Sequence, residues 1–208
     1  MKENDYRKYV IDDGKFIGKF EEMYQQCDDP WLQDSVLHKS NQIVLDILSG
    51  DKYNKILDIG CGKGRFTSLL YKNLNSPIDA IDISETAINI ARESYPGINF
   101  IADDFLKTEQ ISNSYDLIII SQILWYVLDK IDVFFEKIKN ISTQSAKVIF
   151  IQTYYNPDTQ KYGRDIMTKA ENILHRIPFE INNVIDVKNY KGGTWIDTES
   201  IIICRNSR

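Results

Sequence analysis

The chain has 208 residues, a formal net charge of −5, 43% hydrophobic residues and 26% charged residues. These values suit one globular domain with a full hydrophobic core, and they argue against a nucleic-acid partner because phosphate binding needs clustered positive charge. Three cysteines, Cys27, Cys61 and Cys204, lie far apart without a C-x-x-C pair, which favours free thiols in a reducing compartment. The chain begins with polar residues, and no apolar run approaches the roughly 20 residues that cross a bilayer. We therefore expect a cytoplasmic protein with no membrane partner.

The first 50 residues differ in character from the rest of the chain. The segment "FEEMYQQCDDPWLQD", residues 20–34, is rich in aromatic and acidic residues, and Pro30 interrupts it. A helix is expected over residues 35–50, ending near Gly50. We predict that residues 1–50 form an N-terminal helical cap or lid on a core of residues 51–208, within one domain.

Apolar runs and helical patterns alternate from about residue 54 to residue 180. Strands are expected over residues 54–59, 76–82, 98–103, 115–121, 146–152, 183–190 and 200–206. Helices are expected over residues 64–73, 84–95, 129–142 and 163–177, with Ser84 as the N-cap of the second. This alternation is typical of a doubly wound, mostly parallel α/β sheet. The last two strands flank Gly192-Gly193 with no helix between them, so we expect an antiparallel pair there.

The stretch "KILDIGCGKGRF" places glycines at positions 60, 62 and 64, directly after a strand. A dinucleotide fingerprint would need its third glycine at position 65, where this chain has Arg65. A phosphate-binding loop would need G-K-[ST], which is also missing. The pattern thus favours a ligand that approaches the bare backbone without a pyrophosphate; the alternative is a tight turn that binds nothing.

Acidic residues stand at the ends of three successive predicted strands: Asp58, Asp82 and the pair Asp103-Asp104. Asp82 can accept hydrogen bonds from both hydroxyls of a ribose. An acid at the next strand end can accept from an adenine amino group, while Asp58 beside the glycines favours a positive group. S-adenosylmethionine has all three features and no phosphate. Each acid taken alone is equally well a solvated turn residue or a helix cap.

Four motifs, "ILDIGCGKGRF", "AIDIS", "FIADDF" and "YDLIIISQILWYV", resemble in order and spacing those of class I S-adenosylmethionine-dependent methyltransferases. The resemblance covers residues 43–155. It implies a seven-stranded Rossmann-like sheet of order 3-2-1-4-5-7-6, with strand seven antiparallel.

The resemblance also implies a binding site for S-adenosylmethionine and its product S-adenosylhomocysteine. Gly60 and Gly62 would let the backbone pass beside the methionine portion, and Asp58 would lie near its amino group. Asp82 would bind the ribose. Asp104 aligns best with the acid that contacts adenine, whereas Asp103 stands where glycine is more usual. The full predicted set is Asp58, Gly60, Cys61, Gly62, Gly64, Asp82, Ile83, Asp103, Asp104, Phe105, Ser121, Gln122 and Trp31.

The acceptor side is suggested by a shorter likeness. Residues 20–34 and the run "SQILWYV" are similar to the nodulation N-methyltransferase group and related small-molecule methyltransferases, and that group acts on amino sugars of an oligosaccharide. The likeness makes Trp31 a lid contact and Tyr24 an acceptor contact, unless both only fasten the segment to the sheet. The remaining acceptor candidates lie after strands four and five: Trp125, Tyr126, Tyr154, Tyr155 and Arg164.

We therefore expect an enzyme that methylates an amine or hydroxyl of a small molecule, with a sugar or sugar nucleotide as the best guess. The alternatives are an RNA or protein methyltransferase and a non-catalytic methyltransferase-like partner subunit. No spacing of ligands predicts a metal site. His38 and His175, the chain's only histidines, are interpreted as surface or packing residues, with His38 the better candidate if one is a base. The sequence assigns no catalytic residue and no oligomeric state.

Overall fold

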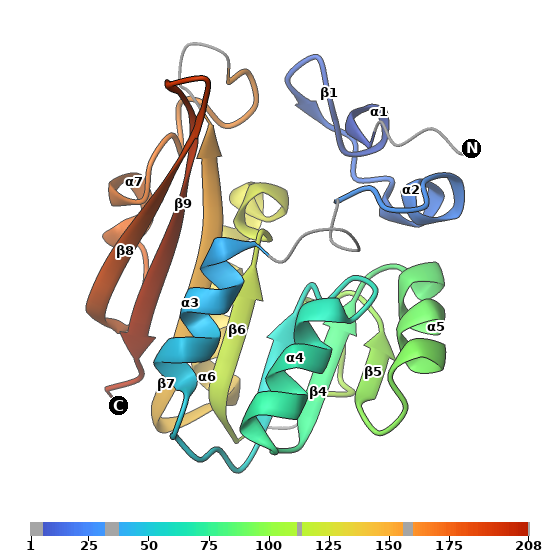
Figure 1. Ribbon diagram of the computed structural model, residues 1–208, viewed down its shortest axis with the longest axis vertical. Helices are drawn as coiled ribbons and strands as arrows, with labels where there is room; N and C mark the ends of the chain where they lie inside the picture. The colour runs from blue at the N-terminus through green and yellow to red at the C-terminus, as the bar shows by residue number, and fades with distance from the viewer. Residues whose placement is uncertain (1–5, 32–37, 112–113, 156–159, 208) are drawn as a thin grey trace.

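The computed structural model describes residues 6–31, 38–111, 114–155 and 160–207. Its main feature is a sheet in which the described strands follow the order β5-β4-β3-β6-β7-β9-β8 (Figure 1). The strands are β3 (Ile56–Ile59), β4 (Ile78–Asp82), β5 (Asn99–Ala102), β6 (Tyr115–Ser121), β7 (Ser142–Tyr155), β8 (Glu180–Lys191) and β9 (Thr194–Arg205). β9 is antiparallel to both neighbours, and the other pairings are parallel. The predicted order, including the antiparallel seventh strand, is confirmed.

Helices cover both faces of the sheet, as a mostly parallel sheet requires. The helices α3 (Lys39–Leu48), α4 (Arg65–Leu74) and α5 (Glu85–Ser94) pack their apolar residues into one core cluster. α6 (Ile131–Ile141) packs into the cluster on the opposite face, and Figure 1 shows α3 and α4 in front of the sheet with α6 behind it. All four residues of β3 are buried between these layers, which explains why three of them are apolar and why the fourth, Asp58, has a hydrogen-bond partner. None of the helices among the described residues is long and apolar enough to cross a membrane.

The predicted helix over residues 163–177 is wrong. Only α7 (Glu171–Leu174) is helical there, because side chains capture backbone groups that a helix would use. Gln160 Nε2 donates to the carbonyl of Met167, and Asn172 Oδ1 accepts from the backbone N–H groups of Thr168 and Lys169. Gly163, at φ 65°, adopts a left-handed conformation in which a Cβ would lie 2.7 Å from a methyl group of Leu128.

The N-terminal cap consists of α1 (Arg7–Val10), a hairpin of β1 (Ile11–Asp12) and β2 (Lys15–Phe16), and α2 (Phe20–Gln26). Figure 1 places it above α5, at the carboxyl ends of the neighbouring strands. α3, which belongs to the same predicted N-terminal region, packs on the sheet beside α4 instead. Two 3₁₀ turns, Leu124–Tyr126 and Leu128–Lys130, follow β6.

At the opposite edge of the sheet, where the parallel strands begin, a partly buried polar cluster joins neighbouring strands. Tyr115 Oη donates to Asp79 Oδ2 at 2.6 Å, and Asn99 Nδ2 donates to Asp79 Oδ1 at 2.8 Å. Lys55 Nζ lies 2.9 Å from the same carboxylate. The cluster links the first residues of β4, β5 and β6 to the residue that precedes β3.

Removing the hydroxyl of Tyr115 is expected to destabilise the fold, because a buried hydrogen bond to a carboxylate is lost. We expect Tyr115→Phe to lower the free energy of unfolding by about 2 kcal/mol, measured by urea denaturation. The control is Tyr71→Phe on the exposed side of α4, which should change it by less than about 0.5 kcal/mol. Equal stability of the two variants would show that the cluster does not hold the strands together.

Candidate functional site

A cavity of about 1210 Å³ lies where the carboxyl ends of β3, β4 and β6 meet the N-terminal cap. It is lined by most of the residues that the sequence predicted: Trp31, Tyr24, Gly60, Gly62, Asp82, Ile83, Asp103, Asp104, Phe105, Ser121, Gln122, Trp125, Tyr126 and Tyr155. Asp58, Cys61, Gly64, Tyr154 and Arg164 do not line it. The carboxyl-end edge of an open α/β sheet is where such folds bind ligands.

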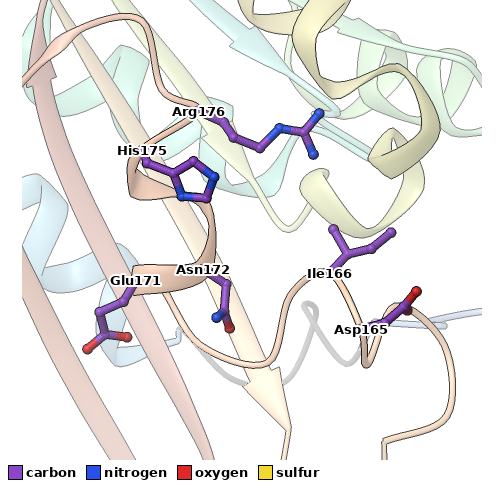
Figure 2. A pocket seen from close by; sticks show the side chains of 6 residues that line it. All are labelled: Asp165, Ile166, Glu171, Asn172, His175 and Arg176. Carbon is purple, nitrogen blue, oxygen red and sulfur yellow. The ribbon is translucent and has the colours of Figure 1, made fainter.

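A second hollow, of about 590 Å³, is formed by a single stretch of chain, residues 165–176 (Figure 2). Figure 2 shows His175 and Glu171 on one side, Asp165 on the other and Arg176 toward the top of the view. Of the residues that line this hollow, none lines the larger cavity or belongs to the predicted site. The larger cavity is therefore the candidate site.

The glycine turn gives the cavity a wall of bare backbone. Gly60 has φ 77°, and a Cβ built there would lie 2.0 Å from Cδ1 of Ile123. Gly64, also at φ 77°, begins α4 and packs against Phe100, where a Cβ would lie 2.7 Å from the ring. Gly60 therefore leaves room for the turn beside the cavity, whereas Gly64 serves the packing of α4 on β5. Cys61, between them, is buried outside the cavity.

Asp82, the last residue of β4, is held by two backbone groups. Its Oδ2 accepts from the N–H of Gly62 at 2.9 Å, and its Oδ1 accepts from the N–H of Ser84 at 3.0 Å. Each carboxylate oxygen has two acceptor sites, so one on each remains for a ligand. Burial raises the pKa of Asp82, and these hydrogen bonds oppose the rise. The cradle thus fits a ligand that presents two neighbouring hydroxyl groups.

Asp103 and Asp104 both line the cavity, and each is engaged locally. Asp103 Oδ1 accepts from the N–H of Asp104 at 2.8 Å, while Asp104 Oδ1 accepts from the N–H of Leu106 at 3.0 Å. The pKa of Asp103 lies below its ordinary value, and the hydrogen bond from Thr108 makes the largest contribution. Phe105 is buried between them and the core, edge-on to Phe134 at 5.3 Å. Both acids line the cavity, and their contact with adenine stays a prediction.

Asp58 lies beneath the glycine turn, not in the cavity wall. It is only 2% exposed, and its Oδ2 accepts from Thr67 Oγ1 at 2.6 Å. Burial raises the pKa of this carboxyl to about 6, although the bond from Thr67 opposes the rise. Asp58 thus joins β3 to α4 directly, which was not expected from the sequence.

Ser121 and Gln122 end β6 at the cavity. Gln122 has φ 61°, a left-handed conformation that is uncommon for a residue with a side chain. Its Oε1 accepts from the N–H of Thr153 at 2.9 Å, and its own N–H donates to the carbonyl of Ile151 at 2.7 Å. The side chain is therefore turned onto β7, so β6 and β7 are held together where they meet the cavity.

Glu21 of α2 anchors the cap to the N-terminus of α5. Its Oε2 accepts from Ser84 Oγ at 2.6 Å and from the N–H of Thr86 at 3.2 Å. Although burial opposes ionisation, these hydrogen bonds hold the pKa of Glu21 below its ordinary value. Ser84 Oγ also accepts from the N–H of Ala87, which confirms its predicted role as N-cap of α5. The carboxylate stabilises the positive end of the α5 dipole as well.

Aromatic side chains form the cap's side of the cavity. Trp31 Nε1 donates to Tyr24 Oη at 2.9 Å, and the Trp31 ring lies 4.7 Å from that of Tyr6 and 6.2 Å from that of Tyr126. Trp31 therefore fastens the cap and also faces the cavity. Phe16 and Phe20 extend the same wall.

The predicted acceptor residues after β6 and β7 divide into two groups. Trp125 and Tyr155 line the cavity, and Trp125 Nε1 donates to the carbonyl of Thr153 at 2.9 Å. The expectation for Tyr154 is corrected, because alternation along β7 turns its side chain into the core, where it is 1% exposed. Arg164 lies in the turn that replaces the predicted helix and does not reach the cavity.

Sequence reasoning missed two groups of cavity residues, the hairpin around Asp13-Gly14 and the aromatics Tyr6, Phe16 and Phe20. It also missed the anchoring role of Glu21, which lies outside the cavity lining. The dipeptide Asp-Gly in "VIDDGKF" is a strong hairpin signal that could have been recognised. The role of Glu21 depends on its contact with Ser84, 63 residues away, which the local sequence does not encode.

Known proteins resemble the chain in sequence and in fold. The model of the methyltransferase domain family matches residues 50–192. Malonyl-[acyl-carrier protein] O-methyltransferase 1 of Ilyobacter polytropus is 30% identical over 101 residues, 47% of this chain and 37% of that protein. The ubiquinone biosynthesis O-methyltransferase of Neisseria meningitidis serogroup C is 23% identical over 182 residues, 83% of this chain and 74% of that one.

The crystal structure of the N-methyltransferase NodS from Bradyrhizobium japonicum WM9, in complex with S-adenosylhomocysteine, has a similar fold. The TM-score is 0.73 at 18% identity, covering 91% of this chain and 98% of that one. This likeness shows a shared fold, while the matched stretch spans only about a third of the Ilyobacter relative.

The buried carboxyl of Asp58 gives a pH dependence that can be measured. Its pKa of about 6 in the folded state exceeds the ordinary value near 4, so its contribution to stability is full below about pH 4 and is lost as the pH rises through 6. Asp58→Asn removes this titration. The free energy of unfolding of the wild type minus that of the variant should fall by about 3 kcal/mol between pH 4 and pH 7.

The comparison uses urea denaturation at a series of pH values, with Asp46→Asn on the exposed side of α3 as the control. That control should show no such trend, since Asp46 is exposed. A pH-independent difference for Asp58→Asn would mean that Asp58 titrates like a solvated carboxyl group.

Proposed function

Because the chain belongs to the class I S-adenosylmethionine-dependent methyltransferases, we propose that it transfers a methyl group from S-adenosylmethionine to an amine or hydroxyl of a small molecule. A sugar or sugar nucleotide is the first candidate acceptor. We also propose a cytoplasmic location, which the free thiols of Cys27, Cys61 and Cys204 support.

The observation that carries the proposal is the arrangement around Asp82. A carboxylate fixed by two backbone N–H groups stands beside a turn without side chains, at the carboxyl end of the strand next to β3. This arrangement suits a ribose with two free hydroxyl groups. Asp103 or Asp104 would then accept from adenine, with Phe105 and Ile83 near the ring. Gly60 and Gly62 would border the methionine portion.

The charges around the cavity support this ligand over a nucleoside phosphate. Six acids line it: Asp12, Asp13, Asp82, Asp103, Asp104 and Asp129. The lining cations, Arg7, Lys8, Lys130 and Lys161, belong to the cap or to the segments after β6 and β7. At the ends of β4 and β5 the charged lining residues are the acids Asp82, Asp103 and Asp104, which would repel a polyphosphate there. Asp58, next to the turn, is a buried carboxyl group that a nearby cation would keep ionised. When bound, S-adenosylmethionine supplies an activated methyl group, and the chain's own residues hold the acceptor in line and exclude water.

The acceptor region is walled by aromatic rings on three sides, from the cap, the turn after β6 and the end of β7. Tyr24, Trp31, Tyr126, Trp125 and Tyr155 supply this wall. Such rings stack on sugars and attract amines through their faces. The relatives named above include two O-methyltransferases and, by fold, an N-methyltransferase, which supports an oxygen or nitrogen acceptor.

Two other functions are less well supported. A nucleic-acid or protein acceptor would call for a basic or extended groove, whereas the net charge is −5 and the aromatic cavity is roofed by the cap. A non-catalytic partner subunit would not need the donor cradle around Asp82. Failure to bind S-adenosylhomocysteine would favour that second alternative.

Donor binding is expected to depend on Asp82. Asp82→Ala removes charge-assisted hydrogen bonds to the ribose, so its affinity for S-adenosylhomocysteine should fall at least about tenfold in calorimetry. Asp46→Ala, on the exposed side of α3, is the control and should bind as the wild type does. NADH should show no saturable binding at micromolar concentration. Tight NADH binding without a response to S-adenosylhomocysteine would refute the proposed function.

The cap is expected to respond to the donor. Trp31 faces the cavity, so hydrogen exchange over residues 16–31 should slow when S-adenosylhomocysteine is added, because lids belong to the less stable parts of a fold. Residues 32 and 33, the rest of the predicted lid, lie outside the described residues. Glu21→Gln should speed exchange in the absence of donor, and Trp31→Ala should weaken donor binding without a large loss of stability.

The control segment for this experiment is α6, on the far face of the sheet, whose exchange should not change with Glu21→Gln. Slow exchange over residues 16–31 that ignores the donor would identify the cap as a fixed part of the fold. In that case its likeness to the amino-sugar enzymes would say little about the acceptor.

A further inference from the structure

His38 and Glu199 form a pair at the edge of the cavity. His38 precedes α3, lines the cavity, and has 43% of its side chain exposed. Its Nδ1 lies 3.3 Å from Oε1 of Glu199, whose side chain is only 6% exposed. A buried carboxylate beside one ring nitrogen of a partly exposed histidine is the arrangement that orients a base.

The strand register brings this pair to the side of the cavity where β6 ends. Glu199 on β9 pairs with Thr153 on β7, and the N–H of Thr153 donates to Gln122 Oε1. Thr153 and Gln122 both line the cavity. Through Glu199 and Thr153, His38 therefore borders the side of the cavity to which Gln122 belongs.

The surroundings of His38 bear on its protonation. The hydrogen bond with Glu199 is the largest effect, and it raises the pKa of His38 above its ordinary value of 6.5, while burial acts in the opposite direction. Asp197 on β9 and the backbone carbonyl of Trp31 also favour the protonated form. Although burial opposes its ionisation, the bond from His38 holds the pKa of Glu199 below its usual range. The carboxylate is thus charged and can place the imidazole proton on Nδ1.

We propose that His38, oriented by Glu199, is the general base that takes the proton from the acceptor's hydroxyl or ammonium group during methyl transfer. This rests on the proposed function above. With the proton on Nδ1, the lone pair of Nε2 receives the acceptor's proton. The acceptor's electron pair forms the new bond to the methyl carbon, and the electrons of the broken carbon–sulfur bond remain on sulfur. Glu199 is the positioning residue, which stabilises the imidazolium that forms.

The tautomer can be tested without any acceptor. The chain has only two histidines, so ¹⁵N-labelled imidazole spectra contain two sets of signals, with His175, at the remote hollow of Figure 2, as the internal reference. We expect neutral His38 to carry its proton on Nδ1 in the wild-type protein saturated with S-adenosylhomocysteine. In Glu199→Gln the pKa of His38 should move down toward 6.5. A proton on Nε2, held by the carbonyl of Trp31, would overturn the proposal.

The catalytic role is tested by rate. S-adenosylmethionine with a deuterated methyl group is incubated with a metabolite extract, and the most rapidly labelled product is followed by mass spectrometry. The rate at saturating donor should rise with pH through the pKa of His38. His38→Gln should lower it at least about 100-fold and abolish that rise, and Glu199→Gln should shift the midpoint to lower pH. His175→Gln is the matched control and should behave as the wild type does.

Donor binding and the rate of methyl transfer together distinguish the role of His38 from the proposed function. S-adenosylhomocysteine binding within about twofold of the wild type in His38→Gln would show an intact donor site, and loss of methyl transfer would then support the base. A His38→Gln rate within about threefold of the wild type, with an unchanged pH profile, would overturn the role of His38 while leaving the proposed function intact. A wild-type protein that does not bind S-adenosylhomocysteine would instead refute the function.

Discussion

The carboxylate of Asp82 is the interaction on which the site depends. By accepting from Gly62 and Ser84 at once, it fixes the glycine turn after β3 against the start of α5. The turn can approach this carboxylate because Gly60, at φ 77°, has no side chain to collide with Ile123. One partly buried charge thus holds the turn at Gly62 and the start of α5 at Ser84 at the same end of the sheet.

The cap is attached to the same place. Glu21 of the cap accepts hydrogen bonds from Ser84 and Thr86 at the N-terminus of α5, and Asp82 of the core accepts one from the N–H of Ser84. A shift of α5 would change the hydrogen bonds of both carboxylates. This shared anchor gives a physical reason why donor binding and cap closure should be coupled, since each biases the same few hydrogen bonds.

The sequence predicted the elements of the fold that depend on neighbouring residues in the chain. The apolar runs located the strands, Ser84 marked the start of α5, and the helix-free ending indicated an antiparallel strand. The helix over residues 163–177 failed because Gln160 and Asn172 compete for backbone groups, which periodicity does not reveal. In the candidate site, the acids at strand ends were found, but the buried place of Asp58 and the approach of Glu199 to His38, 161 positions apart, depend on packing and register.

The donor cradle and the acceptor wall are built from different stretches of chain. Asp82, Asp103 and the glycine turn belong to the sheet, whereas Trp31 and its neighbouring rings belong to the cap and to the loops after β6 and β7. Under the proposed function, cap substitutions that spare Trp31 and Glu21 are therefore expected to alter which molecule is accepted without disturbing Asp82 or the glycine turn. The cap and the donor-binding residues can therefore change independently during evolution. A chimaera in which residues 6–31 are replaced by those of a relative is a route to new acceptor specificity, provided that it keeps the carboxylate at position 21, which binds Ser84.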